Sequence, residues 1–171
     1  SGVVRMSGPR LVRAVLEKIP VVTPTVVRNA AGETPEPGVA AGSIIAICGT
    51  NLAPAFQSGP ASPLAQSIAG VTVRVGERLL PLVFVSPEQI NAQLPSDLPE
   101  GDYTATVRWE GQSEVKANFR VVRNAPGLFS NLVESQPWAL GTRADGSLLG
   151  ADNPARRGET VTLLGTGFGP Y

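Results

Sequence analysis

Histidine is absent from this chain of 171 residues, and Cys48 is its only cysteine. Without histidine, neither Ser-His nor Cys-His nucleophile pairs can form, and most zinc sites lose a usual ligand. A single cysteine cannot build an internal disulfide framework, and the apolar stretch SIIAICG around it favours a small buried hydrophobic residue over a nucleophile. The sequence therefore predicts a protein without catalytic residues, bound metal or cofactor.

The chain also lacks an excess of charge of either sign. Fourteen lysines and arginines balance 14 aspartates and glutamates without a basic tract, so a surface for phosphate groups has no electrostatic support. No apolar run approaches the length of a membrane span, and no basic and apolar leader precedes a cleavage site. We expect neither a nucleic-acid partner nor a membrane span, and the start at Ser1 is typical of a processed product.

Glycine, proline and β-branched residues are plentiful. The chain contains 19 glycines and 16 prolines, and 42% of its residues are hydrophobic, which is typical of a turn-rich all-β protein with a real core. Short strand candidates such as SIIAICG and INAQLP lie between turn residues at regular intervals. Val71, Val73 and Val75 alternate with polar residues, so one face of that strand is buried. This pattern predicts a β-sandwich of about seven strands.

Two further segments have recognisable patterns. Residues 101–122 predict a β-hairpin, in which Trp109 ends a set of alternating buried residues. The segment VVTPTVV is flanked or interrupted by Pro20 and Pro24, which lack a backbone donor, so it is an edge strand or a linker. Residues 1–20 fit either a helical stripe or a hairpin, and the SGP turn favours the hairpin.

The end of the chain repeats an earlier stretch. GETVTLLGTGFGP aligns without a gap on GSIIAICGTNLAP, so that Gly158 falls on Gly42 and Thr166 on Thr50. The repeat predicts three parts, which are an N-terminal β-prone segment or linker (1–24), a complete sandwich (25–123) and a partial second unit (124–171). An incomplete unit leaves backbone groups unpaired and apolar residues uncovered. Three outcomes remain open for its last strand: packing on the first sandwich, fraying, or pairing with another molecule.

Several segments together carry a resemblance to a known family: VVRNAAGETPEPGVAAGSIIAICGTNLAP, VFVSPEQINAQLP, NAPGLF and NPARRGETVTLLGTGFGP. They resemble a C-terminal module of secreted acidobacterial proteins, which is similar to a tandem of IPT/TIG-type immunoglobulin-like domains. The likeness covers about residues 25–171, and SPEQINAQLP is its most specific part. The resemblance implies an immunoglobulin-like fold, a secreted or surface setting, commonly after β-propeller repeats, and no established catalytic residues.

Two groups of oxygen-bearing side chains are candidate sites. Asp97, Glu100 and Asp102 cluster as glycosidase carboxylates do, but they lie in a turn pattern where solvated carboxylates are usual. Calcium could be held by Asp145 together with Asp152 and Asn153, but their spacing is not that of an EF-hand loop. We expect both groups to be structural turns.

Amide and aromatic side chains indicate a glycan surface as an alternative function. Gln89, Asn91 and Gln93 alternate with apolar residues, and such amides either bond a carbohydrate or fix nearby backbone groups. Trp138, next to a proline in the looser region, is the better surface aromatic. These four residues are the predicted polysaccharide contacts.

Self-association is the main functional expectation. The residues expected to take part are Val161, Leu163, Leu164 and Phe168 at one end, and Val3, Val4, Leu11 and Val15 at the other. A neighbour's N-terminal segment would supply the strand that the last unit lacks, which gives a homo-oligomer or filament. The sequence thus predicts a non-enzymatic, extracellular or cell-surface structural or adhesive module. A carbohydrate-binding accessory module and a plain spacer are the alternatives.

Overall fold

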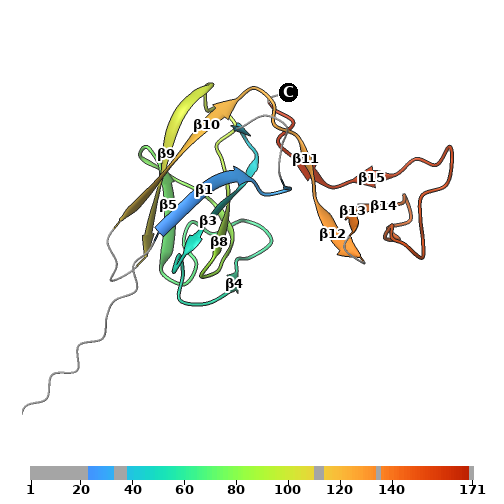
Figure 1. Cartoon of the computed structure of the whole chain (residues 1–171), viewed down its shortest axis with the longest axis horizontal. Coiled ribbons are helices and arrows are strands. Elements are labelled where there is room, and N and C mark those ends of the chain that lie inside the picture. The colour runs from blue at the N-terminus through green and yellow to red at the C-terminus, as the bar shows by residue number, and fades with distance from the viewer. Residues whose placement is uncertain (1–22, 33–37, 110–113, 134–135, 170–171) are drawn as a thin grey trace, which may run out of the picture.

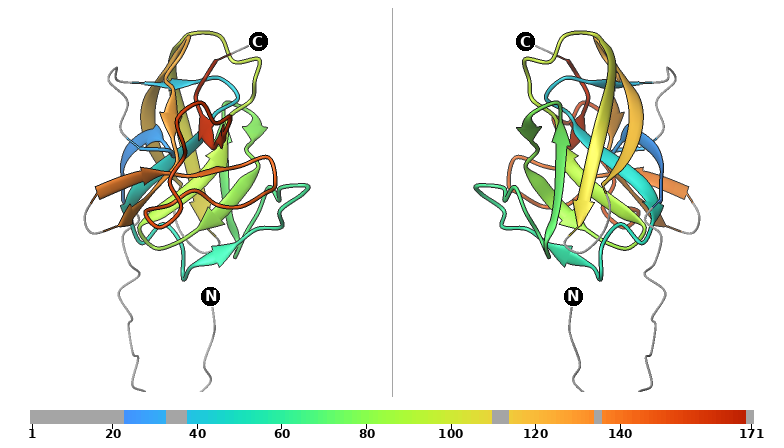
Figure 2. Two further views of the ribbon diagram at one scale, coloured as in Figure 1. Left: turned by 90° about the vertical axis from the view of Figure 1, so that its right-hand side faces the viewer. Right: turned by 90° about the vertical axis from the view of Figure 1, so that its left-hand side faces the viewer.

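The computed structural model describes residues 23–32, 38–109, 114–133 and 136–169, and these residues form strands and turns without any helix. Two five-stranded sheets pack face to face as a β-sandwich, and a thinner arm of short strands extends from one end of it (Figures 1 and 2). No helix long and apolar enough to cross a membrane occurs in the described part of the chain. The predicted all-β sandwich is confirmed.

Sheet A contains, in spatial order, β1 (Thr23–Asn29), β3 (Ile44–Thr50), β8 (Gln89–Gln93), β7 (Leu82–Val85) and β4 (Gln57–Ser58). Sheet B contains β2 (Val39–Ala40), β10 (Val115–Val122), β9 (Gly101–Trp109), β5 (Val71–Val75) and β6 (Arg78–Leu79). The pairs within both sheets are antiparallel, except β2 with β10. Seven of these strands have four or more residues, which matches the predicted number, and the other three have two residues each.

The core lies between the two sheets. Alternation along each strand directs one set of side chains inward, as at Val71, Val73 and Val75 of β5, which are buried against Ile45 and Ile47 of β3 in one cluster. Each fully buried Ile or Val stabilises the fold by about 1.5–3 kcal/mol relative to exposure. This single core holds the sandwich together.

The hairpin and edge-strand predictions also hold. β9 pairs with β10 from Val107–Val115 to Gly101–Val121, although the predicted turn residues lie outside the described part of the chain. Trp109 is partly buried against the core, as expected. β1 is the edge strand of sheet A, and its register shifts between Pro24 and Val26, because proline has no amide to donate.

The expectation that Cys48 is buried was wrong. Its neighbour Ile47 is fully buried in the core, so the next residue of β3 points to the opposite face of the sheet. Cys48 is only half-buried there, and it lies opposite Gln89 of β8 and Val26 of β1. An apolar run cannot by itself tell which residues face the core.

The arm comprises the described residues from 124 to 169. Its strands are β11 (Gly127–Leu128), β12 (Ser130–Val133), β13 (Gln136–Ala139), β14 (Gly141–Thr142), β15 (Thr162–Leu163) and β16 (Gly165–Thr166). They form three two-stranded sheets, β11 with β16, β12 with β13, and β14 with β15. Between Gly127 and Gly165, Gly141 is the one described residue that is buried, so the arm has no core of its own.

Candidate functional site

The arm is attached to the sandwich through a buried asparagine. Asn29, at the end of β1, is 1% exposed. Its Nδ2 donates to the carbonyl of Ala125 at 2.6 Å and lies 3.4 Å from the carbonyl oxygen of Thr166, and its Oδ1 accepts from the amide of Ala31 at 2.7 Å. One side chain thereby joins the sandwich to both chain segments at the base of the arm, the one that leads into β11 and the one that ends β16.

Thr166 and Gly167 complete this contact. The Thr166 hydroxyl accepts a hydrogen bond from the amide of Ile44 at 2.9 Å, and the Ala125 amide donates to the carbonyl of Gly167 at 2.8 Å. We call the set Asn29, Ile44, Ala125, Thr166 and Gly167 the junction. The junction shows that the last repeated segment packs, at its end, on the first sandwich of the same chain.

The pairing of β14 with β15 reproduces the pairing of β1 with β3. In the sandwich, Val27 lies opposite Ile47 and Arg28 opposite Ala46. In the arm, Gly141 lies opposite Leu163 and Thr142 opposite Thr162. The aligned repeat places Leu163 on Ile47 and Thr162 on Ala46, so β15 has an antiparallel partner, β14, at the residues where β3 has β1.

Backbone conformation follows the same repeat. Gly42 and Gly158 have φ values of 73° and 81°, and both precede the repeated strand. Asn51 and Gly167 follow the strand with φ values of 54° and 87°. Left-handed backbone is uncommon for residues other than glycine and asparagine. Its occurrence at matched positions shows that the repeat is present in the structure as well as in the amino-acid sequence.

The two copies differ in what covers their apolar side chains. Ile47 and Leu52 are fully buried in the sandwich, whereas their counterparts Leu163 and Phe168 are 45% and 60% exposed. β3 has neighbours on both edges, β1 and β8, whereas β15 pairs with β14 alone among the described residues. The arm therefore presents the core-facing side of a sandwich without its second layer.

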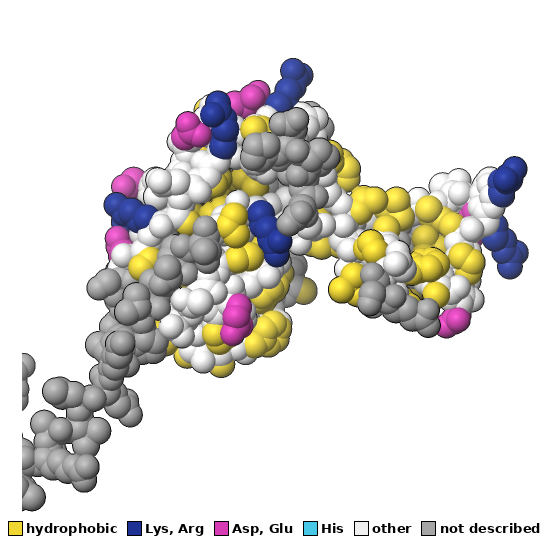
Figure 3. Space-filling view, viewed as in Figure 1, with side chains coloured by type: hydrophobic (Ala, Val, Ile, Leu, Met, Phe, Trp, Pro, Cys, Tyr) yellow, Lys and Arg dark blue, Asp and Glu magenta, His cyan; other side chains and the backbone are white. Residues whose placement is uncertain are grey.

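Exposed apolar side chains continue over the rest of the arm (Figure 3). They are Leu128, Leu132, Val133, Trp138, Leu148, Leu163, Leu164 and Phe168, whereas Val161 is half-buried. The β12–β13 hairpin is exposed at every described position, and an isolated two-stranded hairpin is marginally stable in water. The predicted contacts Val3, Val4, Leu11 and Val15 lie outside the described residues.

The predicted amides lie on the outer face of sheet A. Gln89 donates through Nε2 to Asn91 Oδ1 at 2.7 Å, and Asn91 is largely shielded from solvent, whereas Gln93 is exposed. Trp138 belongs to β13 in the arm, where it lies opposite Asn131 and not beside β8 (Figure 1). The structure thus groups the three amides and separates the tryptophan from them.

Two phenylalanines beside these amides were missed from the sequence. Phe84 of β7 lies directly opposite Asn91, and its ring centroid is 5.7 Å from that of Phe56. The hairpin pattern around SPEQ was a usable signal, because a strand that turns back there places Phe84 near Asn91. Nothing local in the sequence indicated Phe56.

A family model for the IPT/TIG domain matches residues 34–121, which is more than half of the chain. The chain belongs to the IPT/TIG domain family. IPT/TIG domains are immunoglobulin-like, non-catalytic modules that occur commonly in extracellular and surface proteins. The match begins at residue 34, ahead of β2, ends at Val121 of β10 and stops before the arm. The chain has no match among curated proteins or among solved structures.

Three of the five candidate carboxylates, Asp97, Asp102 and Asp145, have structural partners. Near the IPT/TIG sandwich's β9, Asp97 accepts a hydrogen bond from Arg78, which lowers the pKa of that carboxyl, and Asp102 lies 3.8 Å from Arg120. In the arm, Asp145 accepts from the amide of Ser147 at 2.9 Å in a turn. No group of three His, Cys, Asp or Glu side chains that could hold a metal occurs in the ranges that the structure describes.

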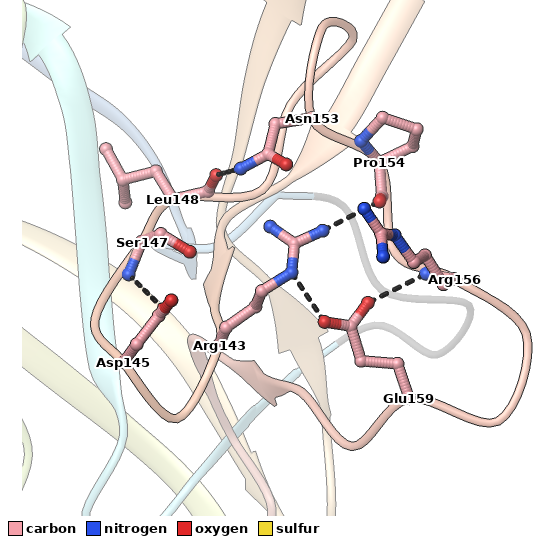
Figure 4. Close-up of polar contacts among 8 residues, drawn as sticks. All are labelled: Arg143, Asp145, Ser147, Leu148, Asn153, Pro154, Arg156 and Glu159. Atoms are coloured by element: carbon pink, nitrogen blue, oxygen red, sulfur yellow. Dashed lines mark hydrogen bonds and ion pairs between the residues drawn. The ribbon is translucent and has the colours of Figure 1, made fainter.

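Beyond the IPT/TIG match, the loop between β14 and β15 is closed by Arg143 and Glu159 (Figure 4). The Glu159 carboxylate accepts from the amide of Arg156 at 2.8 Å and from Nε of Arg143, and Arg143 Nη2 donates to the carbonyl of Pro154 at 2.8 Å. The Arg156 amide, and next the Arg143 guanidinium, lower the pKa of Glu159. The ionised carboxylate is thus the form that holds the loop.

We expect this loop to open in acid. Because the folded pKa of Glu159 lies below its ordinary value, its contribution to the free energy of unfolding is present above the ordinary pKa and is lost as the pH falls through the folded pKa. NMR of the Arg156 amide from about pH 6 to about pH 2 measures this loss. Glu159→Gln should remove the transition, and Asp152→Asn, a change at an exposed carboxylate of the same loop, should keep it. An unchanged transition in Glu159→Gln contradicts the assignment.

Proposed function

We propose that this chain is a non-enzymatic, extracellular structural module that associates with further copies of itself through the arm. The IPT/TIG membership supports a non-catalytic module of the cell surface. The observation that carries the proposal is the exposure of Leu163 and Phe168 at positions where the first sandwich buries Ile47 and Leu52. An apolar layer of this kind is stabilised when a second layer removes it from water.

The occupant we propose is a strand from a second copy. β3 of the sandwich is bordered by β1 and β8, and the arm reproduces only the first of these pairings. A strand added to the open edge of β15 would satisfy its backbone groups, in the manner of β-augmentation, and would place an apolar cross-strand neighbour beside Leu163.

The N-terminal segment of the neighbouring copy suits this role by its composition. Residues 1–24 are β-prone by sequence and carry Val3, Val4, Leu11 and Val15, and the first described strand of the sandwich begins at Thr23. Pairing of one end of the chain with the other end of the next copy is head-to-tail. Such pairing extends into a filament unless its rotation closes a ring.

Light scattering behind a sizing column, over a range of concentrations, tests the proposal. Wild type should form species larger than a monomer, and Leu163→Glu should be monomeric, because it places a charge on the open layer. Leu79→Glu is the matched control, since Leu79 is 43% exposed on β6 of the sandwich, and it should assemble as wild type does. A chain that begins at residue 23 should also be monomeric.

Three outcomes would contradict the proposal. Monomeric wild type at every concentration removes self-association. Assembly that survives in Leu163→Glu places the interface elsewhere. Assembly by the chain that begins at residue 23 removes the N-terminal segment as the occupant.

A further inference from the structure

We propose that the outer face of sheet A binds a polysaccharide that carries carboxylate groups. This surface is separate from the open layer of the arm and does not depend on self-association. One row of cross-strand neighbours crosses it, with Arg28 on β1, Ala46 on β3, Asn91 on β8, Phe84 on β7 and Ser58 on β4. Residues opposite one another in a sheet share a face, so these five side chains lie on one surface.

The row has a low, polar centre between two larger side chains. Ala46 and Asn91 are buried but do not belong to the core cluster, so they form the floor of the outer face. Arg28 stands on one side and Phe84 on the other, three strand spacings away, which is about 14 Å at the usual interstrand distance. This length suits several sugar units of an extended chain more than a single small molecule.

The amide pair supplies hydrogen bonds of both kinds at this floor. The bond from Gln89 Nε2 to Asn91 Oδ1 fixes both side chains. The other polar atoms of the pair are the Gln89 Oε1 acceptor and the Asn91 Nδ2 donor. An adjacent donor and acceptor match two neighbouring hydroxyl groups of a sugar, each of which can donate and accept.

The aromatic pair supplies a stacking surface beside the amides. The rings of Phe56 and Phe84 are tilted by 37°, and Phe56 is 67% exposed. The face of an aromatic ring carries partial negative charge and attracts the weakly positive C–H groups of a sugar ring. Solvent exposure of such a large ring is unfavourable unless a ligand covers it.

Arg28 selects the acidic class of polysaccharide. Its side chain is exposed and forms no ion pair with any described residue. A guanidinium is suited to bidentate bonding with a carboxylate. A uronic acid unit at the β1 side of the row would therefore meet Arg28 while its neighbours reach the amides and rings.

The test uses polygalacturonate and a neutral β-glucan as probes, with affinity measured by gel retardation. Polygalacturonate should retard wild type more strongly than β-glucan does. Phe56→Ala should weaken that binding about tenfold, and Arg28→Gln should remove the preference for the acidic polymer. Trp138→Ala is the matched aromatic control on the arm and should bind as wild type. Thermal unfolding of each variant checks that the sandwich is intact.

Cys48 provides an independent readout of the same surface. It is the only cysteine, and it lies half-buried opposite Gln89, so bound polygalacturonate should slow its reaction with a thiol reagent several-fold. Binding that leaves this rate unchanged would place the polymer elsewhere and overturn the proposal. So would an absence of binding to both polymers, equal binding to both, or a loss of binding in Trp138→Ala but not in Phe56→Ala.

Discussion

Gly167→Ala should detach the arm from the sandwich, with a loss of about 3 kcal/mol or more in the free energy of docking. Gly167 has a φ of 87°, and a Cβ at this residue would lie 2.0 Å from the carbonyl oxygen of Ala125 and 2.6 Å from Nδ2 of Asn29. Both neighbours are buried parts of the junction, so neither can move without breaking its hydrogen bonds. Trypsin should then cut after the exposed Arg123 and release the arm.

Gly146→Ala is the matched control for the backbone effect. Its φ is 83°, and a Cβ there meets no atom within 4 Å. Gly146→Ala should lower the free energy of unfolding by only about 1 kcal/mol, because alanine disfavours the left-handed backbone conformation, and it should leave the junction closed. Equal trypsin cleavage of the two variants would show that the crowding at Gly167 does not hold the arm.

Asn29→Ala should weaken the junction by about 2–4 kcal/mol, because it leaves the carbonyl of Ala125 and the amide of Ala31 without their partner. Hydrogen exchange at the amide of Ile44, which donates to Thr166, should report this loss as faster exchange. The change in side-chain volume is small beside the loss of two hydrogen bonds at a site that is almost fully buried.

Two comparisons separate hydrogen bonding from mere burial. Asn29→Asp keeps the acceptor for Ala31 but sets a carboxylate oxygen against the carbonyl of Ala125, so it should be worse than alanine at neutral pH and should recover in acid, when the carboxyl can donate. Asn118→Ala removes an exposed amide that bonds Thr104 and should change little. Wild-type exchange at Ile44 in Asn29→Ala would refute the role assigned to Asn29.

Much of the sandwich could be predicted because its determinants are local. Alternation in VTVRV and in residues 101–122 specified which side chains face inward, and glycine and proline marked the turns. The repeat could be detected in the sequence because the same backbone turns require glycine or asparagine at matched positions, such as Gly42 and Gly158.

The remaining features depend on contacts between distant residues. The sequence around Asn29 is that of an ordinary turn. Asn29 joins the arm to the sandwich only because Ala125 and Thr166, which are distant in the sequence, lie against it in the fold. The same limit explains why Trp138 was grouped with the amides and Phe56 was not. The alternation of apolar and polar residues along a strand predicts on which face of the sheet a residue lies. It does not predict which strand pairs beside it.

The order of folding follows from the distance of the junction along the chain. Asn29 precedes Ala125 by 96 residues and Thr166 by 137, whereas every strand of the sandwich lies between Thr23 and Val122. During synthesis the sandwich strands are made first, and the edge that holds Asn29 remains in water until its last partner leaves the ribosome. Docking of the arm is then the final step. We therefore expect the junction contacts to form after the sandwich's transition state, so that they slow unfolding of the finished protein without speeding its folding.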